Sequence, residues 1–206
     1  MVVHASRQEE RSAATRRALL DATIACLVEE GHGGTTGPAV AKRAGLSRGA
    51  QLHHFGTRDQ MVVAAVEHLA QMRLAAVGSR LQKIEDQPPT DTDVAQPVAR
   101  AALELLAGAL SGPLYAATLE LWVAARANAE LREELVPAEQ RVHVELWEVC
   151  RRYVTEDPDE IQLTLDLLLG QGVSGMFHAD RAERHRNALD RWERLLDNTS
   201  TSAHRR

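Results

Sequence analysis

The sequence predicts an all-α protein of about nine helices, and two observations carry that prediction. Apolar side chains recur at the helical repeat of i, i+4, i+7 and i+8, as in Leu20, Ile24, Leu27 and Val28. Runs of Val, Ile and aromatic residues bounded by turn residues are missing, and aromatic residues make up only 3% of the chain. A β-sheet would therefore have little material from which to form.

The first two helices are bounded by glycine and by polar capping residues. The first helix is expected over residues 12–30, because Gly31 and the glycines after it interrupt its pattern. Thr36 caps the second helix, and Pro38 stands in its first turn, where a missing N–H is harmless. Gly45 closes this helix, since glycine adopts the left-handed turn that ends many helices.

The third helix is short and the fourth is long. Ser47 caps the third helix, which is expected over residues 48–54 and is ended by Gly56. Thr57 and Gln60 have the spacing of a capping box, in which each side chain binds the backbone N–H of the other residue. The fourth helix therefore begins immediately after the third and is expected to continue to about position 78 or 84.

The rest of the chain continues the helical pattern after one surface loop. Residues 86–93, with Pro88 and Pro89, predict that loop. Five more helices are then expected, at residues 94–110, 113–127, 129–153, 158–177 and 181–197. A frayed tail is expected over residues 198–206.

Composition and charge narrow the class of protein. Cys26 and Cys150 stand 124 positions apart, which excludes a disulfide-stapled scaffold and a cysteine zinc site. The first 60 residues hold eight Arg and Lys against six Asp and Glu, whereas the remainder carries a net charge of −7, so the amino-terminal part is the basic one. No apolar stretch approaches about 18 residues and no signal core opens the chain, which predicts a cytoplasmic protein without a membrane partner.

Residues 41–47 have the spacing of a helix-turn-helix. Ala41 allows two helices to cross closely, Gly45 permits the turn, and Leu46 fills the gap between the helices. The first turns of the third helix then face outward with side chains that donate hydrogen bonds or that allow DNA to approach, namely Arg48, Gly49, Gln51, His53 and His54.

These residues and their neighbours resemble a known family. The matching residues are Thr36, Ala41, Ala44-Gly45-Leu46-Ser47, Arg48-Gly49-Ala50, His53-His54-Phe55 and Gly56-Thr57-Arg58-Asp59. In order and spacing, residues 12–70 resemble the tetracycline-repressor (TetR) family. The resemblance implies a homodimeric regulator that binds double-stranded operator DNA, most often a repressor released by a small-molecule effector. It also implies a DNA-binding helix-turn-helix domain over residues 1–57 and a ligand-binding and dimerisation domain over residues 58–206.

Two positions depart from the commonest family pattern. Leu52 stands where a tyrosine that touches phosphate is usual, and Gly37-Pro38 replaces longer side chains. We expect Leu52 to pack inward, which leaves phosphate contacts to the Thr36 hydroxyl, the N–H groups at helix starts and Arg58.

Base reading is then expected of Arg48 and Gln51, because arginine pairs bidentately with guanine and glutamine with adenine. His53 is expected near the DNA backbone and His54 nearer the fourth helix, the alternative being that both only cap and pack. Arg16 and Arg17 either touch phosphates or belong to a solvated helix face. The predicted DNA-binding residues are Thr36, Ser47, Arg48, Gly49, Gln51, His53 and Arg58.

The last two helices are predicted to form the dimer interface. Gly170, Gly172 and Gly175 spell G-x-G-x-x-G, but no strand precedes them, so the dinucleotide-binding interpretation is rejected. Three glycines in one helix instead indicate close approach by a helix of the other subunit, unless both helices lie inside the monomer core. The predicted interface residues are Leu165, Leu168, Gly172, Gly175, Met176, Leu189, Trp192 and Leu196.

A small-molecule cavity follows from the resemblance, and its candidate lining is drawn from the scarce large side chains of the middle helices. These are Met72, Tyr115, Leu119, Trp122, His143, Trp147, Cys150 and Phe177. No catalytic, cofactor or metal-ligating residue is predicted. Two alternatives remain: an all-α ligand-binding or enzymatic bundle in which the first three helices are only structural, and a protein-interaction adaptor.

Overall fold

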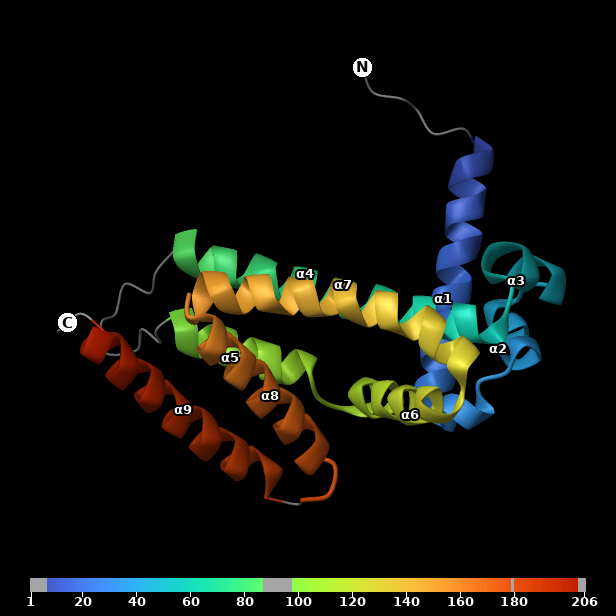
Figure 1. The fold of residues 1–206 in the computed structure, drawn as a ribbon. Coiled ribbons are helices and arrows are strands. Elements are labelled where there is room, and N and C mark those ends of the chain that lie inside the picture. The colour runs from blue at the N-terminus through green and yellow to red at the C-terminus, as the bar shows by residue number, and fades with distance from the viewer. Residues whose placement is uncertain (1–6, 87–97, 179, 204–206) are drawn as a thin grey trace. The chain divides into compact units, whose positions relative to one another are not determined.

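The computed structural model describes residues 7–86, 98–178 and 180–203, and within this part the chain forms nine α-helices and no strand (Figure 1). The helices are α1 (Arg7–Gly34), α2 (Gly37–Ala44), α3 (Arg48–Phe55), α4 (Arg58–Asp86), α5 (Val98–Ala109), α6 (Pro113–Ala127), α7 (Ala129–Tyr153), α8 (Pro158–Ser174) and α9 (Arg181–Ala203). The predicted all-α class is confirmed.

Two predicted boundaries need correction and one lies outside the described part. The helix α1 begins at Arg7, and α9 continues through residues 198–203, because no glycine or proline stops either helix there. The frayed tail predicted over those residues is therefore wrong, while residues 204–206 lie outside the described part. The loop predicted over residues 86–93 also lies outside it from residue 87 onward.

The chain divides into two compact units, and each is described by itself. The first comprises Met1–Leu69 with Ala117–Gln140, and the second comprises Ala70–Ala116 with Arg141–Arg206. In the first unit one core joins α1, α2, α3 and the start of α4, built around Leu19, Leu20, Val40, Phe55 and Met61. A second core joins α1 and α4 to α6 and α7, around Leu27, Val62, Leu121, Leu131 and Leu135.

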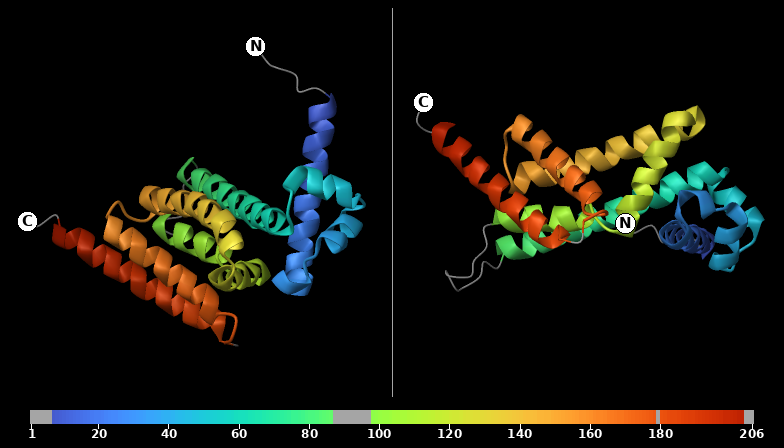
Figure 2. Two further views of the ribbon diagram at one scale, coloured as in Figure 1. Left: turned by 45° about the vertical axis from the view of Figure 1, so that its right-hand side comes forward. Right: turned by 90° about the horizontal axis from the view of Figure 1, so that it is seen from below.

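The second unit has one large apolar core contributed by α4, α5, α7, α8 and α9. Its most buried members include Leu81, Leu103, Leu106, Leu165, Leu168 and Leu189. The helices α8 and α9 lie side by side in every view (Figure 2). Two side-chain hydrogen bonds tie α8 to its neighbours: the Tyr115 hydroxyl donates to the Leu169 carbonyl at 2.8 Å, and Trp192 Nε1 donates to Thr164 Oγ1 at 2.9 Å.

Helix α4 is also the described helix whose length and apolar character suffice to cross a membrane on its own. Its 18-residue window has a mean hydropathy of 1.2. Six of its apolar side chains are buried in the cores of the two units: Met61, Val62, Val63, Leu74, Val77 and Leu81. Core packing accounts for the apolar character of those six positions.

Candidate nucleic-acid interface

The turn between α2 and α3 is held by one glycine and two backbone hydrogen bonds. Gly45 has φ 66° and ψ 28°, the left-handed conformation that glycine adopts without a steric penalty. The N–H groups of Gly45 and Leu46 donate to the Lys42 and Ala41 carbonyls at 3.2 and 2.9 Å. Ala41 is buried and Leu46 packs against the core, so the helix-turn-helix predicted from residues 41–47 is confirmed.

Both predicted capping residues at this turn cap their helices. Thr36 Oγ1 accepts from the Ala39 N–H at 3.3 Å, and Ser47 Oγ accepts from the Ala50 N–H at 3.2 Å. Because capping uses an oxygen lone pair, each hydroxyl keeps its own hydrogen for another acceptor. Both residues are exposed, so each hydroxyl can donate to a phosphate oxygen.

Helix α3 exposes one face, made of Arg48, Gly49, Leu52 and His53. Within the described part of the chain, no ion pair or hydrogen bond occupies the Arg48 guanidinium. Gly49 adds no side chain beside it, and a Cβ there would lie 3.6 Å from Ser47 Oγ. The amino-terminal turn of α3 therefore presents a free guanidinium fork next to bare backbone.

The expected orientations of Gln51 and Leu52 on α3 are both wrong, and one cause explains both. Gln51 is only 2% exposed, and its Oε1 lies 2.8 Å from where a Cβ would stand on Gly37, so its amide packs against the start of α2. Leu52, expected to pack inward, is 48% exposed. The core of the first unit sits on the side of α3 that carries Gln51 and Phe55, and successive residues point about 100° apart, so Leu52 turns outward.

The two histidines of α3 differ in exposure. His53 is exposed and His54 is half-buried, with ring centroids 5.2 Å apart in an edge-on arrangement. The His54 ring lies 6.4 Å from the Phe55 ring. Nearby on α1, the Arg16 guanidinium lies over the Phe55 ring at 5.0 Å. His53 is therefore open to an outside partner, and its contact with the DNA backbone stays a prediction.

Arg58 does not present its guanidinium to an outside phosphate. Its Nε donates to the Thr35 carbonyl at 2.6 Å, and its terminal nitrogens bind the His32 carbonyl, His32 Nε2 at 3.2 Å and Asp59 Oδ1 at 2.9 Å. The carbonyls at the end of a helix have no partner inside it, and Arg58 occupies that of His32 together with that of Thr35, the residue directly after α1. The expected phosphate contact is therefore replaced by a structural role that closes the end of α1.

A break in α1 explains why this helix end needs outside partners. Gly31 has φ 67° and ψ −177°, which interrupts the helix and frees the His32 N–H. Glu120 on α6 accepts from that N–H at 2.7 Å. A bond across 88 positions has no sequence signal, so this contact of Glu120 could not be predicted from the sequence.

The start of α4 is capped as predicted. The Thr57 N–H donates to Gln60 Oε1 and the Gln60 N–H donates to Thr57 Oγ1, both at 3.1 Å, which completes a capping box. Gln60 Nε2 also donates to Glu134 Oε1 on α7 at 2.8 Å. This end of α4 is thus fixed directly after Gly56, the residue that ends α3.

The predicted dimer residues divide between buried and exposed positions. Five are buried in the chain's own cores and cannot face a partner: Leu165, Leu168, Gly172, Leu189 and Leu196. Gly172 is approached closely, but by the same chain, since a Cβ there would lie 2.3 Å from the Leu110 carbonyl oxygen. For these five the monomer-core alternative is correct. Met176 is exposed, and Gly175 and Trp192 are half-buried.

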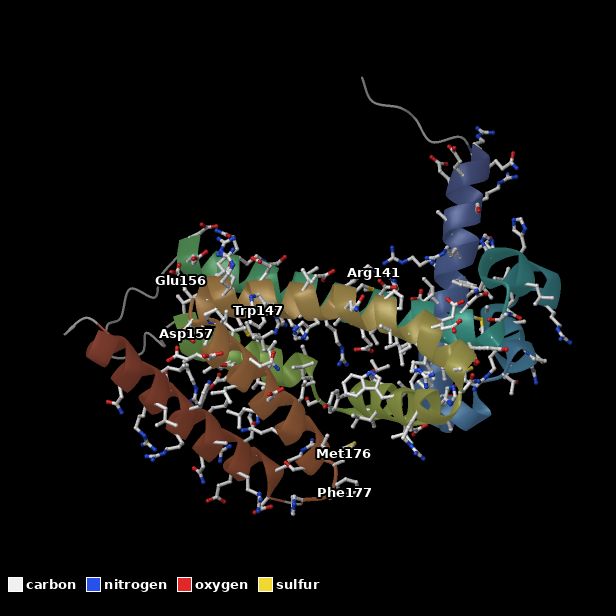
Figure 3. All side chains as sticks on the ribbon, in the orientation of Figure 1. Arg141, Trp147, Glu156, Asp157, Met176 and Phe177 are labelled. Carbon is white, nitrogen blue, oxygen red and sulfur yellow. The ribbon has the colours of Figure 1, made fainter. Side chains whose placement is uncertain are left out.

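The predicted ligand-lining residues are distributed over both units. Leu119 and Trp122 belong to the first unit, and the other six belong to the second. The expectation is wrong for Phe177, which is 78% exposed and points away from the helices beside Met176 (Figure 3). Cys150 is fully buried, and burial raises the pKa of its thiol to about 12. The Tyr115 hydroxyl donates to the Leu169 carbonyl of α8, and one edge of its ring packs against Gly172 of the same helix.

Of the remaining members, Met72 and His143 are exposed, and Trp147 packs against the core of the second unit. The rings of His143 and Trp147 lie 6.1 Å apart on successive turns of α7. None of these contacts assigns the three side chains to a ligand, so their role stays a prediction.

Sequence reasoning missed a set of buried polar atoms in the first unit. Trp122 Nε1 and His68 Nε2 are buried without a hydrogen-bond partner. The Trp122 N–H faces the Glu139 carboxyl without hydrogen-bond geometry. Burial raises the pKa of that carboxyl, the Trp122 N–H lowers it, and the charge of Glu67 raises it further. Only the packing of α4, α6 and α7 brings these groups together.

Comparison with known proteins identifies the family. Residues 19–65 match the profile described as "Bacterial regulatory proteins, tetR family". The helix-turn-helix transcriptional regulator CymR of Pseudomonas putida is 31% identical over 190 residues, which cover 88% of this chain and 90% of CymR. An uncharacterised regulator of Mycobacterium tuberculosis (strain ATCC 25618 / H37Rv) is 31% identical over 131 residues, which span 64% of this chain and only 63% of that relative.

Solved structures share the fold. The multidrug binding protein EbrR, complexed with imidazole, superposes with a TM-score of 0.64 at 22% identity, covering 93% of this chain and 97% of EbrR. A transcriptional regulator from Rhodococcus sp. Rha1 gives a TM-score of 0.63 at 24% identity, covering 88% and 95%. The sequence match to CymR, the profile match over the helix-turn-helix and the shared fold lead to one conclusion: the chain belongs to the tetR family of bacterial regulatory proteins.

Proposed function

We propose that this protein is a sequence-specific DNA-binding transcriptional regulator, a homodimeric repressor whose operator binding is relieved by a small-molecule effector. Residues 1–57 then act as the DNA-binding domain and residues 58–206 as the ligand-binding and dimerisation domain of a cytoplasmic protein without a membrane partner. The observation that carries the proposal is the outward-facing first turn of α3, where Arg48 has no partner within the described part of the chain.

In this proposal α3 enters the major groove. Arg48 pairs with guanine O6 and N7, and Leu52 offers its apolar side chain to base edges in place of the buried Gln51. The hydroxyls of Thr36 and Ser47, the side chain of His53 and the N–H groups at the helix starts bind phosphates and fix the register. The half-buried Arg58, whose guanidinium is held by the end of α1, supports this surface and makes no contact with DNA.

The dimer is proposed to form through the exposed apolar side chains of α8, α9 and the turn between them. These are Leu163, Val173, Met176, Phe177 and Leu195. Exposed apolar side chains on adjacent elements suit the two-fold pairing that is commonest among soluble oligomers. Analytical ultracentrifugation tests it directly: a Leu163→Glu/Val173→Glu variant should sediment as a monomer, whereas a Val123→Glu/Val144→Glu variant, at exposed valines of α6 and α7, should remain a dimer.

The effector is proposed to bind at the buried polar atoms of the first unit. Trp122 Nε1 and His68 Nε2 are buried without a hydrogen-bond partner, at a cost of about 1–3 kcal/mol for each unpaired group. A ligand that carries its own donors and acceptors would remove this cost. EbrR, which shares the fold, is named as a multidrug binding protein, and its complexes contain imidazole, proflavin, ethidium and malachite green.

Selection of bound fragments from random double-stranded DNA tests the function. We expect enrichment of a two-fold symmetric site, and Arg48→Ala should weaken binding to that site by about 1–3 kcal/mol for each base pair that the arginine reads, with relaxed preference there. The matched control is Arg191→Ala, an exposed arginine of α9. If no sequence is enriched, or if Arg48→Ala weakens binding to every sequence equally, Arg48 is not a reader. Robust catalysis without DNA binding would favour the enzymatic alternative.

A further inference from the structure

A pocket of about 160 Å³ lies between α8 and α9 in the second unit, close to the turn that joins them. Leu167 and Ala188 line it with apolar surface, and every other side chain that lines it is polar or basic, apart from Gly175. Its volume exceeds that of a single water site several-fold. It is separate from the α3 face and from the buried polar atoms of the first unit, because its lining residues all belong to α8, α9 and the turn between them.

Gln171 and Ser174 are the polar residues on the α8 wall of this pocket, and Gln171 carries the longer side chain. Its side-chain Nε2 and Oε1 are both buried, and neither has a hydrogen-bond partner. An amide with a free donor and a free acceptor inside a protein is rare, since each unpaired group carries a desolvation penalty. A ligand that both accepts and donates hydrogen bonds would satisfy both atoms of this amide.

The opposite wall is basic. Arg181 and Arg184 stand one turn apart on α9, and neither forms an ion pair within the described residues. His178 and His185 also line the pocket. Burial lowers the pKa of His185, the charge of the nearby Glu104 raises it, and the charge of Arg100 lowers it. Glu104 and Arg100 form a salt bridge with each other at 2.8 Å. No carboxylate lines the pocket, so the two arginines have no counter-charge there.

We propose that this pocket binds a small organic carboxylate that also carries a hydrogen-bond donor. The carboxylate lies against the guanidinium groups of Arg181 and Arg184, which match its two oxygens in geometry and charge. Gln171 Nε2 donates to the ligand, and Gln171 Oε1 accepts from its hydroxyl or amino group. Leu167 and Ala188 cover the carbon skeleton between them.

The test uses L-malate, which has carboxylates and one hydroxyl donor, titrated into the full-length protein by isothermal titration calorimetry at constant ionic strength. We expect a dissociation constant of about 1 mM or tighter for the wild type. Arg181→Gln/Arg184→Gln should weaken binding at least about tenfold, because it removes both charge-assisted contacts. The matched control is Arg191→Gln/Arg194→Gln, which removes the same charge from exposed positions of α9 outside the pocket and should leave the affinity unchanged.

Gln171→Met separates a ligand contact from a structural role. Replacing an unpaired buried amide with an apolar side chain of similar shape should leave the thermal stability equal or higher, while malate affinity falls about threefold to tenfold. Three results would overturn the proposal: no heat of binding up to about 20 mM malate, equal losses in the two double-arginine variants, or full affinity in Gln171→Met. Inorganic phosphate that binds as tightly as malate would mark a general anion site and overturn the carboxylate assignment.

Discussion

Gly172 should be intolerant of even one added methyl group, and the structure gives the reason. A Cβ at this position would lie 2.3 Å from the Leu110 carbonyl oxygen and 2.5 Å from Tyr115 Cε1, both well inside van der Waals contact. The oxygen belongs to the backbone at the end of α5, so it cannot rotate away as a side chain can. Gly172→Ala must therefore shift α8 against its neighbours.

The expected magnitude follows from two opposing effects. Overpacking of a close-packed interior costs about 1–3 kcal/mol, and alanine in a helix regains about 0.5–1 kcal/mol relative to glycine. The net loss of about 1–2 kcal/mol corresponds to a fall in Tm of about 2–8 °C for a chain of this length. Gly78, inside α4, has no atom within 4 Å of the place that a Cβ would take, so Gly78→Ala should raise the Tm by about 1–4 °C.

Thermal unfolding followed by circular dichroism, at one fixed protein concentration, measures both variants. The opposite signs are the informative result, because both changes are the same substitution in helices of the second unit. A Tm for Gly172→Ala equal to or above that of the wild type would refute the close approach of α8 to Leu110.

Four further predictions concern the first unit. Arg58→Ala should lower the Tm, because it exposes the end of α1, and should leave the salt dependence of DNA binding unchanged, because it removes no phosphate contact. A weaker salt dependence in this variant would show that Arg58 contacts DNA phosphate. Glu139→Gln should raise the free energy of unfolding at pH 7.5 but not at pH 4, because a carboxyl with a raised pKa loses stability as the pH rises above its unfolded pKa, and equal effects at both pH values would contradict this. The pKa of His32 is lowered by burial and by the charge of Arg58, so the folded state binds a proton at His32 less readily than the unfolded state does. The free energy of unfolding should therefore fall as the pH drops below about 6.5. Urea unfolding should show a smaller fall in His32→Gln. Gly45→Ala should reduce DNA affinity and stability together, since φ 66° strains any side chain, and retained affinity would show that the turn tolerates it.

The sequence by itself determined the helical class, the caps and the turns of the amino-terminal part. Thr36, Ser47 and the pair of Thr57 and Gln60 cap as predicted, and Gly45 adopts the left-handed turn. These features are local: each depends on residues within about four positions, so the amino-acid sequence contains everything that specifies them. The family resemblance over residues 12–70 rested on the same local pattern.

Tertiary structure alone decided which side chains face solvent and which atoms pair across the chain. Gln51 and Leu52 exchanged their expected orientations because the core lies on one particular side of α3. Arg58 turned from DNA to the end of α1, and Gly172 met Leu110 of its own chain instead of a second subunit. Periodicity states that a helix has an apolar side, but which neighbour covers that side, and which polar atoms burial leaves without partners, depends on contacts between residues tens of positions apart.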